Sequence, residues 1–251
     1  MKKYFLKLTI LFILLFFVTS SIKNYTSFGD TGKKYKFNNV LICIDPGHAN
    51  KINPGTEQIA PRSKIRKAKD TIGTTGVYTK VPEYMFNLKL SFKVQTLLKK
   101  DGFKVIMTRN KNDVRLSNIE RAQVANKSKA NLFIRIHADG SNDKNMHGIS
   151  ILYPALNSNN KSICASSKLI AGTVLSSVIT STSAKSNGIV KRSDLTGFNW
   201  CRTSSILIES GFMSNISEDK KLESDKYEDV IAKGIVNGIE SYFSKNKKDK
   251  R

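Results

Sequence analysis

Hydrophobic and polar positions along this chain follow two different periods. Short, largely apolar runs are typical of strands that are buried on both faces of a sheet. Such runs occupy residues 40–44, 103–107, 132–136, 148–153 and 206–208. Between them, apolar residues recur every three or four positions, a pattern that predicts helices at 84–100, 118–125, 162–182 and 227–243. This alternation predicts a single α/β domain in which a twisted, mostly parallel sheet is flanked by helices.

Two local signals support the ends of these helices. Asp101 and Gly102 form a turn-forming pair that stops the first helix. Ser117 precedes the second helix and Glu120 stands three residues later, which is the sequence pattern of a capping box. We therefore expect that helix to begin directly after Ser117.

Three of the predicted strands lead directly into residues that can carry chemistry. The strand at 40–44 is followed by Asp45 and, after a Pro-Gly pair that ends it, by His48. In the same way the later strands lead into His137 and Glu209. In open α/β sheets the carboxyl ends of the strands are where sites form. Two imidazoles and a carboxylate at such ends predict a metal site with its base.

Length and charge bound the class of protein. A chain of 251 residues with 39% hydrophobic content is enough for one domain with a real core. The formal charge of +22 implies attraction to a polyanion, such as nucleic acid, anionic lipid or the acidic polymers of a cell envelope. No nucleic acid is expected as a partner, because the chain has no RNP-type strand, helix-turn-helix or zinc-finger spacing. A biased codon composition, rich in Lys, Asn and Ile, accounts for the charge equally well.

The three cysteines do not predict a disulfide framework. Cys43 lies inside the first strand, where it is expected to be a small buried hydrophobe. Cys164 and Cys201 could pair, although nothing in their spacing requires it. None of the three has a spacing that predicts thiolate ligation of zinc.

The N-terminal segment predicts export. Lysines at positions 2, 3 and 7 precede an apolar stretch over 8–18, which is too short for a membrane span and fits a signal peptide. We interpret 1–21 as a signal peptide or an N-terminal anchor, so that the working domain lies outside the cytoplasmic membrane. Residues 22–38 are expected to be a linker, 39–245 the catalytic domain and 246–251 a basic tail.

A long segment with little apolar periodicity spans residues 49–80. Loops of this length in a compact domain are usually functional or disordered. The segment carries a basic cluster, made of Arg62, Lys64, Arg66, Lys67 and Lys69. Two interpretations stay open: a basic lid that faces the substrate, or a solvated insertion.

A family resemblance rests on four separated motifs. They are IDPGH at 44–48, Glu83 followed by Asn-Leu at 87–88, IHA at 136–138 and ESGFMSN at 209–215. Alone, Glu83 would predict only a cap at the positive end of a helix. In this order and at these distances, the motifs resemble the signature of the type-3, zinc-dependent N-acetylmuramoyl-L-alanine amidases. The resemblance covers nearly all of the chain after the linker, including the segment 115–126.

The resemblance implies a site and a fold. His48, Glu83 and His137 would be the ligands of one zinc ion per chain, Glu209 the catalytic carboxylate, and the fold zinc-exopeptidase-like. The chemistry agrees, because a His₂Glu set leaves a fourth position for water, as a catalytic zinc requires. Zinc lowers the pKa of bound water to about 7. Glu209 would take the proton of that water and return it to the departing amine.

Two residues near the predicted ligands have a role that the sequence leaves open. Asp45 either orients His48 from behind or is only a turn residue before Pro-Gly. Arg135 stands where many family members have Ser, and lies on the same face of the strand as His137. It would contact an acidic part of the substrate or pair with a buried carboxylate. Asp139 also departs from the family, in which Asn is common.

The expected function is cleavage of the amide between N-acetylmuramic acid and the L-alanine of the stem peptide. A zinc exopeptidase is one alternative, since the family resembles those enzymes in fold. A non-catalytic, cationic wall-binding protein is the other, although such a protein has no need of Glu209. Peptidoglycan is the expected partner. Because the chain has no wall-binding repeats, its affinity for the wall would come from the domain itself, from the attraction of its charge to anionic wall polymers or a membrane surface, or from a protein activator. Spore-cortex modification and general wall turnover both stay open as roles.

Overall fold

The computed structural model describes residues 37–155 and 161–248, of which 246–248 are described by their backbone alone. The predicted signal peptide or anchor at 1–21 lies outside the described residues, as do most of the linker and the end of the tail. Two predicted boundaries are corrected. Phe37 is buried and stacks on Phe103 with ring centroids 4.2 Å apart, so the domain includes part of the expected linker. The last helix continues to Lys248, into the expected tail.

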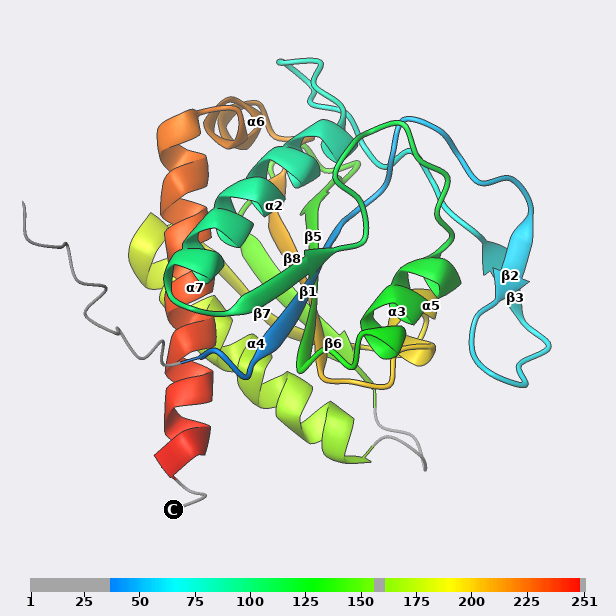
Figure 1. The fold of residues 1–251 in the computed structure, drawn as a ribbon. Coiled ribbons are helices and arrows are strands. Elements are labelled where there is room, and N and C mark those ends of the chain that lie inside the picture. The colour runs from blue at the N-terminus through cyan, green and yellow to red at the C-terminus, as the bar shows by residue number, and fades with distance from the viewer. Residues whose placement is uncertain (1–36, 156–160, 249–251) are drawn as a thin grey trace, which may run out of the picture. The chain divides into compact units, whose positions relative to one another are not determined.

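A six-stranded sheet forms the centre of the domain, in the order β4-β1-β5-β8-β6-β7 (Figure 1). The strands are β1 (Leu41–Pro46), β4 (Lys104–Met107), β5 (Leu132–Asp139), β6 (Ile149–Pro154), β7 (Ser186–Arg192) and β8 (Ser205–Phe212). All neighbouring pairs are parallel except β6 and β8, which are antiparallel. The expected α/β fold with a mostly parallel sheet is confirmed. Because β1, β5 and β8 are adjacent and parallel, their carboxyl ends lie at one edge.

Helices cover both faces of the sheet (Figure 1). The larger core lies under α2 (Glu83–Lys100), α4 (Lys161–Thr182) and α7 (Asp225–Lys248). The smaller core lies under α3 (Asn118–Lys127), and a separate small cluster joins Phe198 of the short α5 (Thr196–Asn199) to Leu152 and Leu207. Successive side chains of a strand point to opposite faces. Ile42 and Ile44 accordingly belong to the larger core and Cys43 to the smaller one.

Helix α4 is long and apolar enough to cross a membrane, and it is the one such helix in the described part of the chain. Its apolar residues, however, are buried within the domain. Ile170, Val174 and Val178 are fully buried, and the helix packs against α7 and β6. We therefore assign α4 to the core of the domain.

The predicted strands and helices are all present, and the capping box at Ser117 and Glu120 forms as expected. The structure adds elements that the apolar pattern did not predict. The segment 49–80 contains a two-stranded hairpin, β2 (Thr56–Gln58) and β3 (Arg66–Ala68), and a short helix α6 (Ile216–Leu222) follows β8. Edge strand β7 and helix α5 were likewise not predicted.

The three cysteines are all buried and free, so Cys164 and Cys201 do not form the bridge that the sequence left open. Burial raises the pKa of Cys201 to about 11, and burial next to Asp45 raises that of Cys43 further. Both thiols are therefore protonated and unreactive at neutral pH.

Candidate active site at the carboxyl edge of the sheet

A tight turn after β1 places His48 at this edge. His48 has a φ of 57°, in the left-handed region, and Gly47 donates a backbone hydrogen bond of 2.9 Å to the carbonyl of Ile136. A Cβ at Gly47 would lie 2.2 Å from Cε1 of His137, so only glycine lets the turn approach that ring. As a result the two imidazole rings meet edge to face, with centroids 4.8 Å apart.

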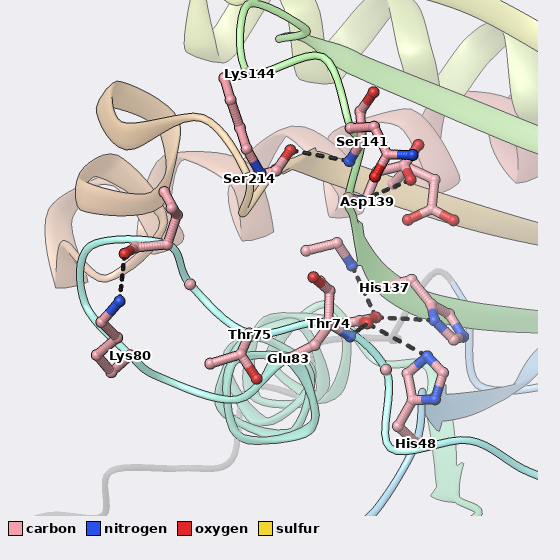
Figure 2. Close-up of a pocket in the computed structure, with 17 residues that line it drawn as sticks. His48, Thr74, Thr75, Lys80, Glu83, His137, Asp139, Ser141, Lys144 and Ser214 are labelled. Carbon is pink, nitrogen blue, oxygen red and sulfur yellow. Dashed lines mark hydrogen bonds and ion pairs between the residues drawn. The ribbon is translucent and has the colours of Figure 1, made fainter.

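Glu83 joins the two histidines from the first turn of α2 (Figure 2). One carboxylate oxygen, Oε1, lies 3.1 Å from Nδ1 of His137, and Oε2 lies 3.4 Å from Nε2 of His48. Each of the three residues offers one ligand atom, and these atoms all lie within 4.8 Å of one another. The structure thus brings together three residues that are distant in the sequence.

The carboxylate of Glu83 is held by hydrogen bonds from its surroundings. Oε2 accepts from the backbone N–H of Thr74 at 2.9 Å, and Oε1 accepts from Nδ2 of Asn87 at 3.0 Å and from the backbone of Ala138 at 3.2 Å. Burial disfavours the charged carboxylate, but the hydrogen bonds with the two histidines outweigh it and hold the pKa of Glu83 well below its usual range. Glu83 is therefore an anion at neutral pH, aimed at both rings.

A metal ion fits these three residues. Nδ1 of His48 lies 2.7 Å from the carbonyl oxygen of Thr71, so this nitrogen carries a proton, and Nε2 is the nitrogen that can give its lone pair to a metal ion. Burial lowers the pKa of His137 to about 4, which keeps its ring neutral, and Nε2 of this ring is buried with no hydrogen-bond partner among the described residues. Two imidazoles and a carboxylate are the donor set of a catalytic zinc site with an open position.

Glu209 lies beside this group. The parallel register of β5 and β8 pairs it with His137, and its side chain is half-buried. Oε2 has no hydrogen-bond partner within the described part of the chain. Burial, together with the nearby charges of Glu83 and Asp139, raises the pKa of Glu209 well above its usual range. A carboxyl group with a raised pKa holds a proton more readily than an ordinary glutamate, which suits a general acid and base.

These residues open into a cleft of about 770 Å³. One wall is the stretch from Gly73 to Lys80, and the opposite wall is the stretch from Ala138 to Lys144, with Ser214 beside it (Figure 2). Gly73 has a φ of 86°, and a Cβ there would lie 2.4 Å from Oε2 of Glu83, so glycine is required for the first wall to pass the site. The basic cluster at 62–69 does not line this cleft.

Of the two roles that the sequence left open for Asp45, orienting His48 or forming a turn, neither describes its contacts in the structure. The Asp45 carboxylate is fully buried and accepts from Nη1 of Arg121 at 2.9 Å and from Nε of Arg135 at 2.8 Å. These guanidinium groups, together with the hydroxyl of Thr108, satisfy the carboxylate. For Arg135, the interpretation as partner of a buried carboxylate is therefore the one that the structure supports. The contact with His48 comes from Arg121, whose Nη2 donates to the His48 carbonyl at 3.0 Å.

Several residues of the site were not predicted from the sequence. Asp70 lies behind His48, with Oδ1 3.9 Å from its Nδ1, and Arg109 donates to the backbone carbonyls of Pro46 and Gly47 at 2.9 Å each. Asp70 is in the segment without apolar periodicity, where no pattern singles out a residue. Arg109 lies two residues after the end of a predicted strand, much as His48, His137 and Glu209 lie at the ends of theirs, and that position was the available signal.

Comparison with known proteins agrees with this geometry. Residues 42–241 match the N-acetylmuramoyl-L-alanine amidase family. An N-acetylmuramoyl-L-alanine amidase of Mycobacterium tuberculosis is 26% identical over 215 residues, which cover 82% of this chain and 87% of that protein. An N-acetylmuramoyl-L-alanine amidase from Clostridium difficile 630, whose crystal structure is known, is 28% identical in sequence. The two structures match with a TM-score of 0.68 over 82% of this chain and 98% of that chain. The catalytic domain of CwlV, an N-acetylmuramoyl-L-alanine amidase from Bacillus (Paenibacillus) polymyxa, is 26% identical, with a TM-score of 0.65 and coverage of 82% and 98%.

Proposed function

The chain belongs to the N-acetylmuramoyl-L-alanine amidase family, and from that premise we propose how its own residues perform the reaction. The enzyme is a peptidoglycan hydrolase that cleaves the amide between N-acetylmuramic acid and the L-alanine of the stem peptide. Because its substrate is the cell wall, it acts outside the cytoplasm. Proposed below are the metal, the residue roles and the setting.

We propose that His48, Glu83 and His137 hold one zinc ion per chain. The convergence of three ligand atoms within 4.8 Å of one another supports this assignment. When bound, zinc would supply Lewis acidity to the scissile carbonyl and lower the pKa of a water molecule to about 7. The hydrogen bonds that Nδ1 of His48 donates to the carbonyl of Thr71 and that Asn87 donates to Glu83 would keep the ligands in orientation.

Glu209 would be the general base and acid. Its carboxylate would take the proton of the attacking water and then deliver it to the amine of the departing L-alanine. The strand pairing that sets Glu209 beside His137 fixes its position relative to the ligands. The single observation that carries this role is the unpartnered Oε2 in the cleft, since a buried carboxyl oxygen without a hydrogen-bond donor is costly unless it has a function.

Analysis of the bond that is cut tests this proposal. Digestion of purified peptidoglycan by the zinc-loaded protein should expose new L-alanine amino groups and no new reducing sugar ends. Release of free D-alanine would instead support the exopeptidase alternative. Binding to the wall without any product would support the cationic wall-binding alternative, in which Glu209 has no task.

We also propose a setting for the enzyme. Residues 1–21 would export the chain or anchor it, 22–38 would be mainly linker, and a formal charge of +22 would favour anionic wall polymers or a membrane surface. Association should then weaken with salt, because charges are screened within about 10 Å at 0.1 M ionic strength. Muropeptide analysis of a deletion strain separates the two roles, since loss of muramic lactam indicates spore-cortex modification and unchanged cortex indicates wall turnover.

A further inference from the structure

The charges in the cleft are unevenly distributed. Three acidic residues, Glu83, Asp139 and Glu209, lie at the end that holds the two histidines. Apart from the histidines, the cationic residues that line the described cleft are Lys80 and Lys144. Figure 2 shows them on the two opposite walls, both on the side away from the histidines. An extended ligand in the cleft therefore meets an acidic end and a basic end.

The wall that carries Lys80 is held in place. Lys80 has a φ of 62°, and its backbone N–H donates to the carbonyl of Gly76 at 3.1 Å. The buried carboxylate of Asp219 accepts from the backbone of Tyr78 at 2.7 Å, and from the backbone and hydroxyl of Thr79 at 2.9 and 2.6 Å. Lys80 therefore has a left-handed backbone conformation on a loop that several hydrogen bonds fix, which indicates that the fold sets its position.

The wall that carries Lys144 is held as well. The backbone carbonyl of Lys144 accepts from Nδ2 of Asn215 at 3.0 Å, and the backbone of Ser141 donates to Oγ of Ser214 at 2.9 Å. In the described residues neither Lys80 nor Lys144 forms an ion pair with an acidic side chain. The ammonium group of Lys80 donates to the carbonyl of Val77 at 2.8 Å, which holds it on the loop without neutralising its charge. Both lysines are exposed, so their charges can meet a ligand carboxylate.

We propose that Lys80 and Lys144 form a carboxylate subsite, which binds the free carboxylate of the second residue of the stem peptide. This inference rests on the proposed function, because it takes the substrate to be a stem peptide. When that residue is a glutamate joined through its side chain, its α-carboxylate stays free and lies about two residue lengths, or about 7 Å, from the scissile amide. The two lysines attract this carboxylate, so the peptide is oriented with its amide toward Glu209.

Two muropeptides that differ in one group test the subsite: one with a free α-carboxylate at the second residue, the other with a carboxamide. The wild-type enzyme should prefer the carboxylate, mainly through a lower KM. Lys80→Ala and Lys144→Ala should each reduce this preference by about two- to fivefold, the effect of a single partly exposed ion pair. The double variant should lose the preference, while Lys144→Arg keeps it. Lys168→Ala, an exposed lysine on α4, is the matched control.

Equal kcat/KM of the wild type for the two muropeptides would overturn the subsite, and so would lysine variants that weaken both substrates alike. Binding of the same two muropeptides to zinc-loaded Glu209→Gln gives the test without turnover. If the preference appears in binding but no hydrolysis occurs in the wild type, the proposed function fails and the subsite stands. If amide cleavage occurs without any preference, the subsite alone fails.

Discussion

Two clusters of buried charge lie side by side at the carboxyl edge of the sheet, and they differ in how well their atoms are satisfied. In the Asp45 cluster, both carboxylate oxygens accept from a guanidinium group, of Arg121 or Arg135. In the proposed zinc cluster, formed by His48, Glu83, His137 and the neighbouring Glu209, one nitrogen of His137 and one oxygen of Glu209 have no partner among the described residues. The first cluster is complete by itself, whereas the second is complete only with a ligand.

This difference distinguishes buried charges that support the fold from buried groups that can bind a ligand. Buried polar groups normally find hydrogen-bond partners, so an unsatisfied one requires an explanation. The Asp45 cluster requires no such explanation, and it supports the zinc cluster. Nη2 of Arg121 donates to the carbonyl of His48 and lies 3.7 Å from Oδ2 of Asp70, a residue that stands behind the His48 ring. We infer that the Asp45 cluster is the rigid base on which the zinc cluster is built.

The largest effect should come from removing a zinc ligand. His137→Ala leaves two ligands, so the protein should lose its zinc and its amidase activity should fall to the background rate. Metal analysis and release of L-alanine amino groups measure both. Chelation of the wild type followed by return of zinc is the control. A protein that holds no zinc, and hydrolyses peptidoglycan equally well with chelator, would contradict the assignment of all three ligands.

The next effect concerns the base alone. Glu209→Gln keeps the shape of the side chain but cannot take a proton, so the rate should fall by about 10²- to 10⁴-fold, the range of general acid–base catalysis. Zinc content and thermal unfolding should match the wild type, because Glu209 is not among the three converging residues. Turnover near the wild-type rate in a zinc-loaded variant would remove Glu209 from the mechanism.

The sequence was sufficient to predict the residues of the zinc cluster but not the partners of the Asp45 cluster. His48, His137 and Glu209 each follow an apolar run, and parallel strands bring such positions to one edge whatever the details of packing. The bonds of Asp45 depend on long-range packing, since Arg121 lies 76 residues away and Arg135 lies 90 residues away. No local pattern connects those positions. Glu83 was identified through the family motif, because periodicity indicates only a helix cap there.

Removing Asp45 tests the structural cluster. Asp45→Ala would leave two buried arginines without their shared partner, which should lower the free energy of unfolding by about 3–5 kcal/mol. Denaturant unfolding of the zinc-free protein measures the loss without a contribution from the metal. Asp45→Asn, which keeps the shape and one acceptor oxygen, should lose less. A loss no larger than that of an exposed ion pair would show that the cluster is not the base of the site.

Acid should weaken the same cluster. Burial opposes ionisation of Asp45, but Arg121 and Arg135 outweigh it and hold its pKa well below the usual value of about 3.9. A depressed carboxyl pKa contributes stability that is complete above the unfolded pKa and is lost as the pH falls toward the folded one. Below about pH 5 the free energy of unfolding should therefore decrease more steeply in the wild type than in Asp45→Asn. Parallel curves would contradict this ion pairing.

The elements that the apolar pattern missed share a physical cause. Edge strand β7 has no fully buried residue, and hairpin strand β3 is exposed at every position, so neither shows the apolar run of a buried strand. The hairpin is held by side chains that reach its backbone: Nε1 of Trp200 donates to Gln58, and Nδ2 of Asn199 donates to Ile59. Such contacts become visible only when α5 is placed against the hairpin.

The smallest effect is expected at the basic cluster of this hairpin, and it decides between the two interpretations of the long segment. Lys67 donates to the carbonyl of Asp194 at 2.8 Å and pairs with its carboxylate at 3.3 Å, on the surface and away from the residues that line the cleft. An exposed pair of this kind contributes about 0.2–1 kcal/mol and is screened by salt. Lys67→Ala should therefore change the free energy of unfolding by no more than that, less at high salt, and leave the KM for a small soluble muropeptide unchanged. A rise in KM comparable to that of Lys144→Ala would show that the hairpin reaches the substrate, and the lid interpretation would then replace that of a solvated insertion.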